Sequence, residues 1–283
     1  AADPLVLDDT PTGSIGLSLG NFNQVILDAD ITGKLSDTVG ASLSGYTNTR
    51  DGYFTNLANG SEINERDRFG LRGEIVFVPS DALSIRAIAD FDSIDEKCCG
   101  VANLVNGPTG AAVLAVGGNL IAENAFAQEQ FLDFDPVNKI DNQGFSVQLD
   151  YDLTDTMSLT SITAYRELDR FEDADVDFTS AALVSQNTGE TLVDTFTQEI
   201  RLSGQAGDKI DWLVGGFYFD EDVQQITDLD YGTSFRAYGD LLAVGGITAT
   251  ETALGLPAGT FFAPGQGVRE TANQADETYS VFA

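Results

Sequence analysis

A repeated unit between residues 25 and 220 is the feature that most constrains how this chain folds. Each copy has a stretch of alternating apolar and polar side chains, a tight turn, a second alternating stretch, and a long polar loop. In the copy from Gly144 to Leu153, the odd-numbered residues are apolar or aromatic and the even-numbered residues are small or polar. Because successive side chains of a strand point to opposite faces, this segment has one face for an apolar medium and one for water.

The same alternation occurs in four other segments, at 25–32, 69–77, 83–91 and 196–203. Two further segments are weaker, because 158–167 is only partly patterned and 212–219 is apolar on both faces. Such strands are typical of a membrane β-barrel, in which apolar side chains face lipid and polar ones face the lumen. They are also typical of a soluble β-sandwich, so periodicity alone leaves both folds open.

The lengths of the connections separate the two folds. Four connections are short and rich in Ser, Thr, Asp or Gly, at 35–38, 79–82, 153–156 and 204–208. Four are long, at 51–66, 96–141, 171–192 and 226–275. Long loops are uncommon in compact domains, and here every second connection is long, which places all long loops at one end of the sheet. Short periplasmic turns that alternate with long extracellular loops are typical of outer-membrane barrels.

The sequence therefore predicts an all-β fold, a segment of an antiparallel up-and-down transmembrane β-barrel with about ten strands. The expected strands lie near 13–20, 24–35, 39–50, 66–78, 82–95, 142–153, 157–169, 192–203, 209–225 and 276–283. No apolar run is long enough for a transmembrane helix. No secretion signal opens the sequence, so we divide it into a lead-in segment, 1–12, and a barrel segment, 13–283.

Charge and composition exclude several functions. The formal net charge is −31, with 14 Lys and Arg against 45 Asp and Glu, which excludes nucleic acid as a partner. The sequence contains no histidine, which is the usual general base of catalysis, and no phosphate-binding glycine motif. We therefore expect no enzymatic activity.

Two groups in the expected loops are candidate sites. Asp173, Asp175 and Asp177 alternate like part of a calcium-binding loop, but the turn glycine and the distal Glu are missing. The alternative for these residues is a solvated acidic loop. Cys98 and Cys99 are the only cysteines, so they form a vicinal disulfide, pair with another chain or stay reduced. An exposed loop in an oxidising compartment favours the vicinal disulfide.

Four arginines on the polar faces of the strands are candidate ligand contacts in a lumen: Arg72, Arg86, Arg166 and Arg201. Acidic residues lie near them in the pattern, so the alternative is a ladder of ion pairs along the wall. The loop segments 101–121 and 241–264 are apolar and rich in Gly and Ala. We expect these segments either to form short helices that pack into the barrel mouth or to present an apolar surface to a ligand.

Several motifs resemble the barrel domain of TonB-dependent receptors, in particular a large group common in sphingomonad-type bacteria. They are TSITAYR at 160–166, QEIRL at 198–202, DWLVGGFYF at 211–219, DRFGLRG at 67–73 and PSDAL at 79–83, with the two cysteines after Ile94-Asp95-Glu96. The ordered motifs span residues 13–283. The resemblance implies a Gram-negative outer-membrane receptor that imports a scarce nutrient, such as a ferric siderophore, cobalamin or an oligosaccharide.

The departures from this family pattern imply a partial chain. Members carry a plug domain, a short box that contacts TonB, and about 22 strands, whereas plug and box motifs are not found in this sequence. The implied partners are outer-membrane lipid, the plug and remaining strands of a parent chain, TonB through that plug, and a small-molecule ligand. Ten strands alone would leave two open edges or close into a narrow, filled barrel. The alternative function is a secreted or surface-bound acidic β-sandwich that binds partners with calcium.

Overall fold

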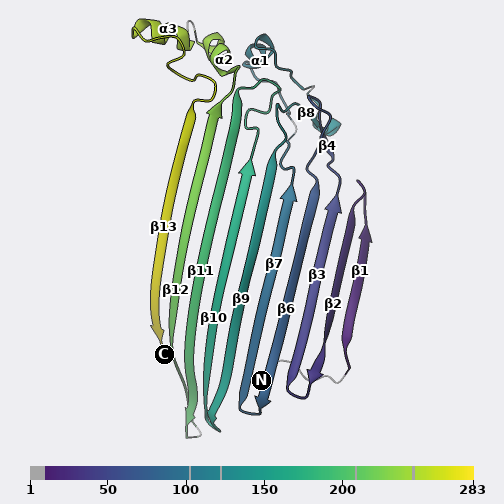
Figure 1. Cartoon of the computed structure of the whole chain (residues 1–283), viewed down its shortest axis with the longest axis vertical. Coiled ribbons are helices and arrows are strands. Elements are labelled where there is room, and N and C mark those ends of the chain that lie inside the picture. The colour runs from purple at the N-terminus through teal and green to yellow at the C-terminus, as the bar shows by residue number, and fades with distance from the viewer. Residues whose placement is uncertain (1–9, 102, 122, 208, 244–245) are drawn as a thin grey trace.

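The computed structural model describes residues 10–101, 103–121, 123–207, 209–243 and 246–283, so most of the expected lead-in segment lies outside the described residues. Ten strands form one antiparallel sheet in which each strand pairs with the next large strand in the sequence (Figure 1). The strands are β1 (Thr12–Leu19), β2 (Val25–Ser36), β3 (Val39–Arg50), β6 (Arg66–Ser80), β7 (Leu83–Glu96), β9 (Val137–Thr154), β10 (Met157–Asp173), β11 (Val184–Ala206), β12 (Ile210–Tyr231) and β13 (Gly267–Phe282).

This architecture confirms the predicted up-and-down arrangement of ten strands. Among the described residues the large sheet is a single layer, which departs from the two packed sheets of a β-sandwich. Strand ends differ from the prediction, because β11 begins at Val184, β12 continues to Tyr231 and β13 begins at Gly267. The backbone ladder continues there through acidic and polar residues, as in the pairing of Thr188 with Asp228. A hydrophobic period therefore cannot mark these strand ends.

The short turns lie at one end of the sheet and the long loops at the other (Figure 1). Two of the turns contain the same kind of hydrogen bond, which explains their shared Ser/Thr-Asp-Thr pattern. The Thr38 N–H donates to Ser36 Oγ at 3.3 Å, and the Thr156 N–H donates to Thr154 Oγ1 at 3.3 Å. A hydroxyl that accepts from the backbone two residues later stabilises a tight reversal.

The long loops fold into a cap above the sheet. The first and second long loops contribute a three-stranded sheet of β4 (Phe54–Asn56), β5 (Glu62–Ile63) and β8 (Glu129–Gln130). The cap also contains α1 (Gly110–Ala115), the 3₁₀ turn η1 (Ala125–Ala127), α2 (Phe235–Leu242) and α3 (Gly246–Ala253). Short helices thus occur in both apolar loop segments, as one of the two expectations for them stated. The strands of the small sheet are only two or three residues long, so no alternating pattern in the sequence predicts them.

Most of the buried apolar side chains lie in the cap and not under the large sheet. Phe54, Ile63 and Leu132 form one cluster. Val113, Ala181 and Leu183 form a second, with Val116, Leu120, Phe235 and Tyr238 packed around it. Among the described residues, no helix has the length and apolar character needed to cross a membrane.

Candidate functional site

One face of the large sheet is apolar, and no other element of the described residues covers it. Strand register brings the apolar residues of neighbouring strands onto this face, since Leu71 pairs with Phe91 and Ala89 pairs with Phe145. Ile75, Phe145 and Ile200 keep about half of their surface exposed, at 53%, 51% and 50%. We call this surface the apolar face; its residues include Leu27, Leu43, Leu71, Ile75, Ile85, Phe91, Phe145, Val147, Leu149, Leu159, Ile200, Leu202 and Val214.

A row of aromatic rings crosses the apolar face on its cap side. The row consists of Phe69, Phe91, Phe145, Tyr165, Phe196, Tyr218 and Tyr279, one from each strand from β6 to β13 of the large sheet. Neighbouring centroids lie 6.4 Å apart for Phe69 and Phe91, 6.0 Å for Phe145 and Tyr165, 6.1 Å for Phe196 and Tyr218, and 4.9 Å for Tyr218 and Tyr279. We call it the aromatic row.

Carboxylates follow directly beyond the aromatic row. The Tyr165 hydroxyl contacts Glu167 and Asp194, each at 2.8 Å, and the Tyr218 hydroxyl contacts Asp220 and Glu277, each at 3.0 Å. The tyrosines therefore have their rings on the apolar side and their hydroxyls on the charged side. This is the boundary at which the apolar band of the sheet ends.

The other boundary of the band lies near the short turns. Phe77 of β6, Tyr151 of β9 and Trp212 of β12 are aromatic residues close to these turns. Phe69 and Phe77 are separated by eight residue steps along β6, about 26 Å at the rise of a strand. The apolar band is thus bounded by aromatic residues on both sides.

The four predicted arginines all form ion pairs on the opposite, polar face. Arg86 contacts Glu74 at 2.7 Å, and Arg201 contacts Glu199 at 2.5 Å. Arg166 and Arg72 share Asp90, at 2.8 Å and 4.0 Å. This geometry is that of a charged ladder along the wall.

Sequence reasoning missed the most buried acidic group of this wall. Glu96, at the end of β7, has 1% of its side chain exposed and contacts Arg66 at 3.0 Å and Arg68 at 2.6 Å. The available signal was the spacing of two arginines by two residues in β6, since alternate residues of a strand share one face. This spacing does not identify the partner of the two arginines, because only the pairing of β6 with β7 brings Glu96 next to them.

A group of three carboxylates lies in the cap. Oxygens of Asp133, Asp175 and Asp177 all lie within 4.8 Å of one another. Asp173, which the sequence pattern grouped with Asp175 and Asp177, instead accepts the Asn187 N–H at 3.1 Å. Asp133 comes from a different loop, so no local pattern could have indicated it. Carboxylate oxygens in such a group are the ligand type that calcium prefers.

Simultaneous ionisation of all three carboxyl groups is unfavourable in this position. Asp175 is 2% exposed and accepts the N–H groups of Asp133 at 3.0 Å, Asp177 at 3.2 Å and Phe178 at 3.0 Å. Burial, together with the neighbouring Asp177 charge, raises the pKa of Asp175 to about 8. Burial also raises the pKa of Asp133 and of Asp177. Desolvation and like charges both disfavour the ionised carboxyl.

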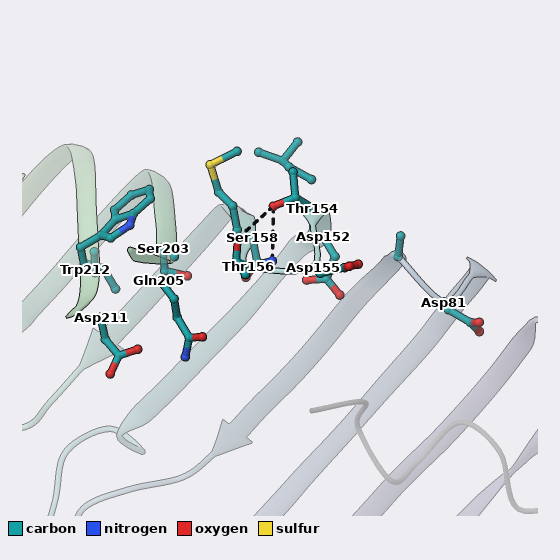
Figure 2. Close-up of a pocket in the computed structure, with 15 residues that line it drawn as sticks. Asp81, Asp152, Thr154, Asp155, Thr156, Ser158, Ser203, Gln205, Asp211 and Trp212 are labelled. Atoms are coloured by element: carbon teal, nitrogen blue, oxygen red, sulfur yellow. Dashed lines mark hydrogen bonds between the residues drawn. The ribbon is translucent and has the colours of Figure 1, made fainter. Parts of the chain in front are cut away.

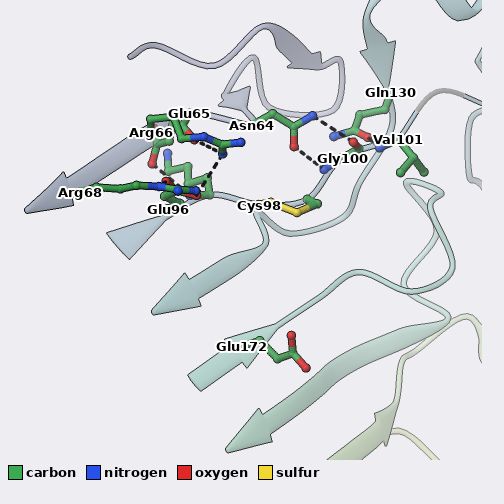
Figure 3. The surroundings of a disulfide bond; sticks show 12 residues. Asn64, Glu65, Arg66, Arg68, Glu96, Cys98, Gly100, Val101, Gln130 and Glu172 are labelled. Carbon is green, nitrogen blue, oxygen red and sulfur yellow. Dashed lines mark hydrogen bonds and ion pairs between the residues drawn. A yellow bond between two sulfur atoms is a disulfide. The ribbon is translucent and has the colours of Figure 1, made fainter. Parts of the chain in front are cut away.

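Cys98 and Cys99 are joined by a disulfide where β7 leaves the sheet (Figure 3). Asn64 holds both sides of the pair, since its backbone N–H donates to Lys97 O at 2.8 Å and its Oδ1 accepts the Gly100 N–H at 2.9 Å. The Asn64 Nδ2 donates to Gly100 O at 3.0 Å. The disulfide thus lies in a segment that backbone hydrogen bonds already position.

An open hollow of about 970 Å³ lies at the end with the short turns (Figure 2). Its lining includes Asp81, Asp152, Asp155, Asp211 and Trp212, and no lysine or arginine. It is open and lies at the opposite end of the sheet from the cap. Turn residues thus form its walls, and it takes no part in the chemistry of the cap.

No family model and no curated protein sequence matches this chain. Solved structures do match it. The siderophore receptor PiuA from Acinetobacter baumannii has a TM-score of 0.56 at 16% identity, covering 96% of this chain and 39% of that one. The ferric-catecholate import receptor Fiu from E. coli, in its open form, gives 0.55 at 13% identity, with coverages of 97% and 41%. The pyoverdine–iron complex of FpvA from P. aeruginosa has a TM-score of 0.56 at 10% sequence identity. The match covers 95% of this chain and 34% of FpvA.

The likeness extends over almost the whole chain, which spans about two fifths of the length of PiuA. The ten-stranded sheet therefore has the fold of part of a TonB-dependent receptor barrel. The sequence motifs predicted this fold, and the matched structures are transport receptors.

Proposed function

We propose that this chain is part of an outer-membrane receptor that takes up a scarce nutrient in a Gram-negative bacterium. The observation that carries this proposal is the uncovered apolar face with its aromatic row. In water, exposed apolar surface is unfavourable by about 25 cal/mol for every Å². A sheet that leaves this much apolar surface uncovered on one side is stable against lipid.

The dimensions of the apolar band support this environment. The nine residues from Phe69 to Phe77 match the roughly 9–11 residues of a strand that spans a membrane. Aromatic residues at both edges correspond to the girdles that membrane barrels carry at their interfaces. In this orientation the cap lies outside the cell and the short turns lie in the periplasm.

The nutrient class and the coupling machinery belong to the same proposal. The matched solved structures are receptors for siderophores, which supports an imported small molecule as the ligand. A ferric siderophore, cobalamin and an oligosaccharide are the candidate classes. The polar face, with its ion-paired arginines, would then line the lumen. Coupling to TonB would require a plug, so no residue of this chain is assigned to it.

Membrane insertion is tested by a pair of adjacent substitutions in β9. Val147 lies on the apolar face and Ser146 on the opposite face. An arginine that faces lipid near the midplane costs about 2–4 kcal/mol. We expect the chain and its Ser146→Arg variant in the outer-membrane fraction, and Val147→Arg to be lost from it. Recovery of the unaltered chain in the aqueous fraction without detergent would overturn the proposal.

Uptake is tested on cells with and without the gene that encodes this chain. Cells would receive labelled ferric siderophore, cobalamin or oligosaccharide at limiting concentration. Loss of uptake for one class, restored by the gene, would support the receptor function and identify the class. Unchanged uptake of all three would contradict it.

A further inference from the structure

The cap contains a cavity of about 310 Å³. Its walls come from the 101–121 loop, from Gln130 and Phe131, and from the turn at 177–179. We propose that this cavity binds a neutral saccharide unit. The inference rests on the proposed uptake function for its biological role, while binding itself is a property of this chain.

A buried donor lines this cavity. Gln130 is 3% exposed, and its Oε1 accepts the Val101 N–H at 3.1 Å. Its Nε2 is buried and has no hydrogen-bond partner among the described residues. This nitrogen packs against Gly100, since a Cβ built there would lie 2.2 Å from it, so Gln130 contributes to the cavity as part of its wall.

Two amide side chains at the rim supply acceptors. The Asn119 Nδ2 donates to Ser180 Oγ at 3.0 Å, and the Asn103 Nδ2 donates to Asn106 Oδ1 at 2.9 Å. These bonds orient both amides, while the Oδ1 atoms of Asn103 and Asn119 make no hydrogen bond to the part of the chain that the structure describes. A hydroxyl can donate a hydrogen bond, so the hydroxyls of a ligand match these two exposed acceptors.

An exposed aromatic ring stands at the same rim. Phe178 is 44% exposed and has a φ of 51°, in the left-handed region that bulky residues rarely adopt. The Asp175 carboxylate holds it there by accepting the Phe178 N–H at 3.0 Å. Strained backbone of this kind collects at functional sites. The negative face of the ring suits the weakly positive C–H face of a sugar ring.

Charge and size restrict the ligand further. Between the ends of the long strands, the loop stretches 51–65, 97–136, 174–183 and 232–266 carry two basic residues, Lys97 and Arg236, and both pair with acidic groups. Asp177, one of the three clustered carboxylates, lines the cavity itself. This surrounding charge disfavours an anionic ligand. The volume lies at the lower end of small-molecule sites, roughly 300–1,000 Å³, which fits a mono- or disaccharide.

The test measures binding of maltose, cellobiose and xylobiose to the purified chain in detergent by saturation-transfer NMR. Digalacturonate serves as the acidic probe. We expect at least one neutral disaccharide to bind and digalacturonate to bind more weakly. Phe178→Gly removes the ring and suits the left-handed backbone, so we expect Kd to rise about fivefold or more. Phe178→Tyr should retain binding.

Two further variants secure the interpretation. Val105 is 70% exposed at the rim, so Val105→Trp should block the cavity without altering the backbone. Phe126→Ala is the matched control, because Phe126 is a 95% exposed aromatic residue of the cap that does not line the cavity. Absence of binding by all three neutral probes, equal binding of digalacturonate, or unchanged binding in both Phe178→Gly and Val105→Trp would overturn the proposal.

The two proposals fail separately. A chain that enters the outer membrane but binds no saccharide overturns the cavity assignment alone. A chain that binds a saccharide but stays in the aqueous fraction overturns the uptake role alone.

Discussion

The Tyr165 hydroxyl of β10 contacts a carboxylate oxygen of Asp194 in β11 at 2.8 Å, while the Tyr165 ring packs 6.0 Å from that of Phe145. One side chain thus joins the apolar face to the charged surface beyond it. Tyr218 repeats the arrangement two strands away, with its ring near Phe196 and its hydroxyl on Glu277. Amphipathic rings are enriched at membrane interfaces for this reason.

Removal of a ring that has neighbours on both sides in the aromatic row should weaken insertion. Tyr218 has ring neighbours on both sides, at 6.1 Å and 4.9 Å. Since each aromatic pair contributes about 0.5–1.5 kcal/mol beyond area burial, we expect Tyr218→Ala to destabilise the inserted chain by about 1–3 kcal/mol. Urea unfolding from lipid vesicles measures this. Phe126→Ala in the cap is the control, and an equal loss in both variants would contradict a role for the row.

Much of the sheet could be predicted from the sequence, because each strand of the apolar band has to separate apolar from polar side chains. Phe145 to Leu153 shows the period directly. The outer part of β11, from Val184 to Leu192, could not be predicted, because both of its faces lie beyond the apolar band. The backbone ladder, and not a hydrophobic period, specifies strand structure there.

The cap was the least predictable part. Asn64 and Gly100, or Asp133 and Asp175, meet only through tertiary folding of separate loops. Local patterns cannot encode such pairs. The arginines of the wall were predictable because strand alternation assigns them to one face, whereas the choice of partner, such as Asp90 for both Arg72 and Arg166, depended on register.

Glu251 should hold the last long loop together. It is 1% exposed, contacts Arg236 at 2.8 Å, and accepts the N–H groups of Gly259 at 3.1 Å and Phe261 at 2.8 Å. These bonds, the arginine first, lower the pKa of Glu251 to about 2. Its contribution to stability is therefore complete above its ordinary pKa of about 4.3 and is lost as the pH falls toward 2.

Replacement of Glu251 by glutamine should leave Arg236 without its charged partner in a largely buried position. We expect hydrogen exchange of the Gly259 and Phe261 amides to rise about tenfold or more, because their acceptor is weakened. Glu123→Gln, an exposed residue of another loop, is the control. Exchange as slow in Glu251→Gln as in the unaltered chain would argue against this role.

The group of Asp133, Asp175 and Asp177 should make the cap less stable as pH rises. The pKa of Asp175 is about 8 in the folded chain, above its ordinary value of about 3.9. The folded state therefore binds the proton more tightly, so the stabilisation is full below pH 4 and is lost as the pH rises through about 8. Cleavage of the cap by proteinase K, normalised to an unstructured peptide at each pH, should increase between pH 5 and pH 8.5.

Asp133→Asn tests most directly whether the carboxylate group causes this pH dependence of cap stability. The Asp133 Oδ1 is buried and has no hydrogen-bond partner among the described residues, so an amide there loses no acceptor contact at that atom. It removes one of the like charges that raise the pKa of Asp175. We expect a cap more resistant to proteinase K at pH 8 and a flatter pH profile. A steeper profile in Asp133→Asn would show that the charge of Asp133 is not unfavourable.

Calcium should reverse the effect of high pH if it binds the same three carboxylates, which we propose in place of the 173–177 pattern. A divalent cation stabilises ionised carboxylates, so at pH 8 millimolar calcium should protect the cap from proteinase K. Asp133→Asn should abolish most of this protection. Asp173→Asn should retain it, because Asp173 accepts a backbone N–H outside the group. Equal protection in both variants, or none in the unaltered chain, would exclude calcium at this position and leave the three carboxylates as a proton-binding group alone.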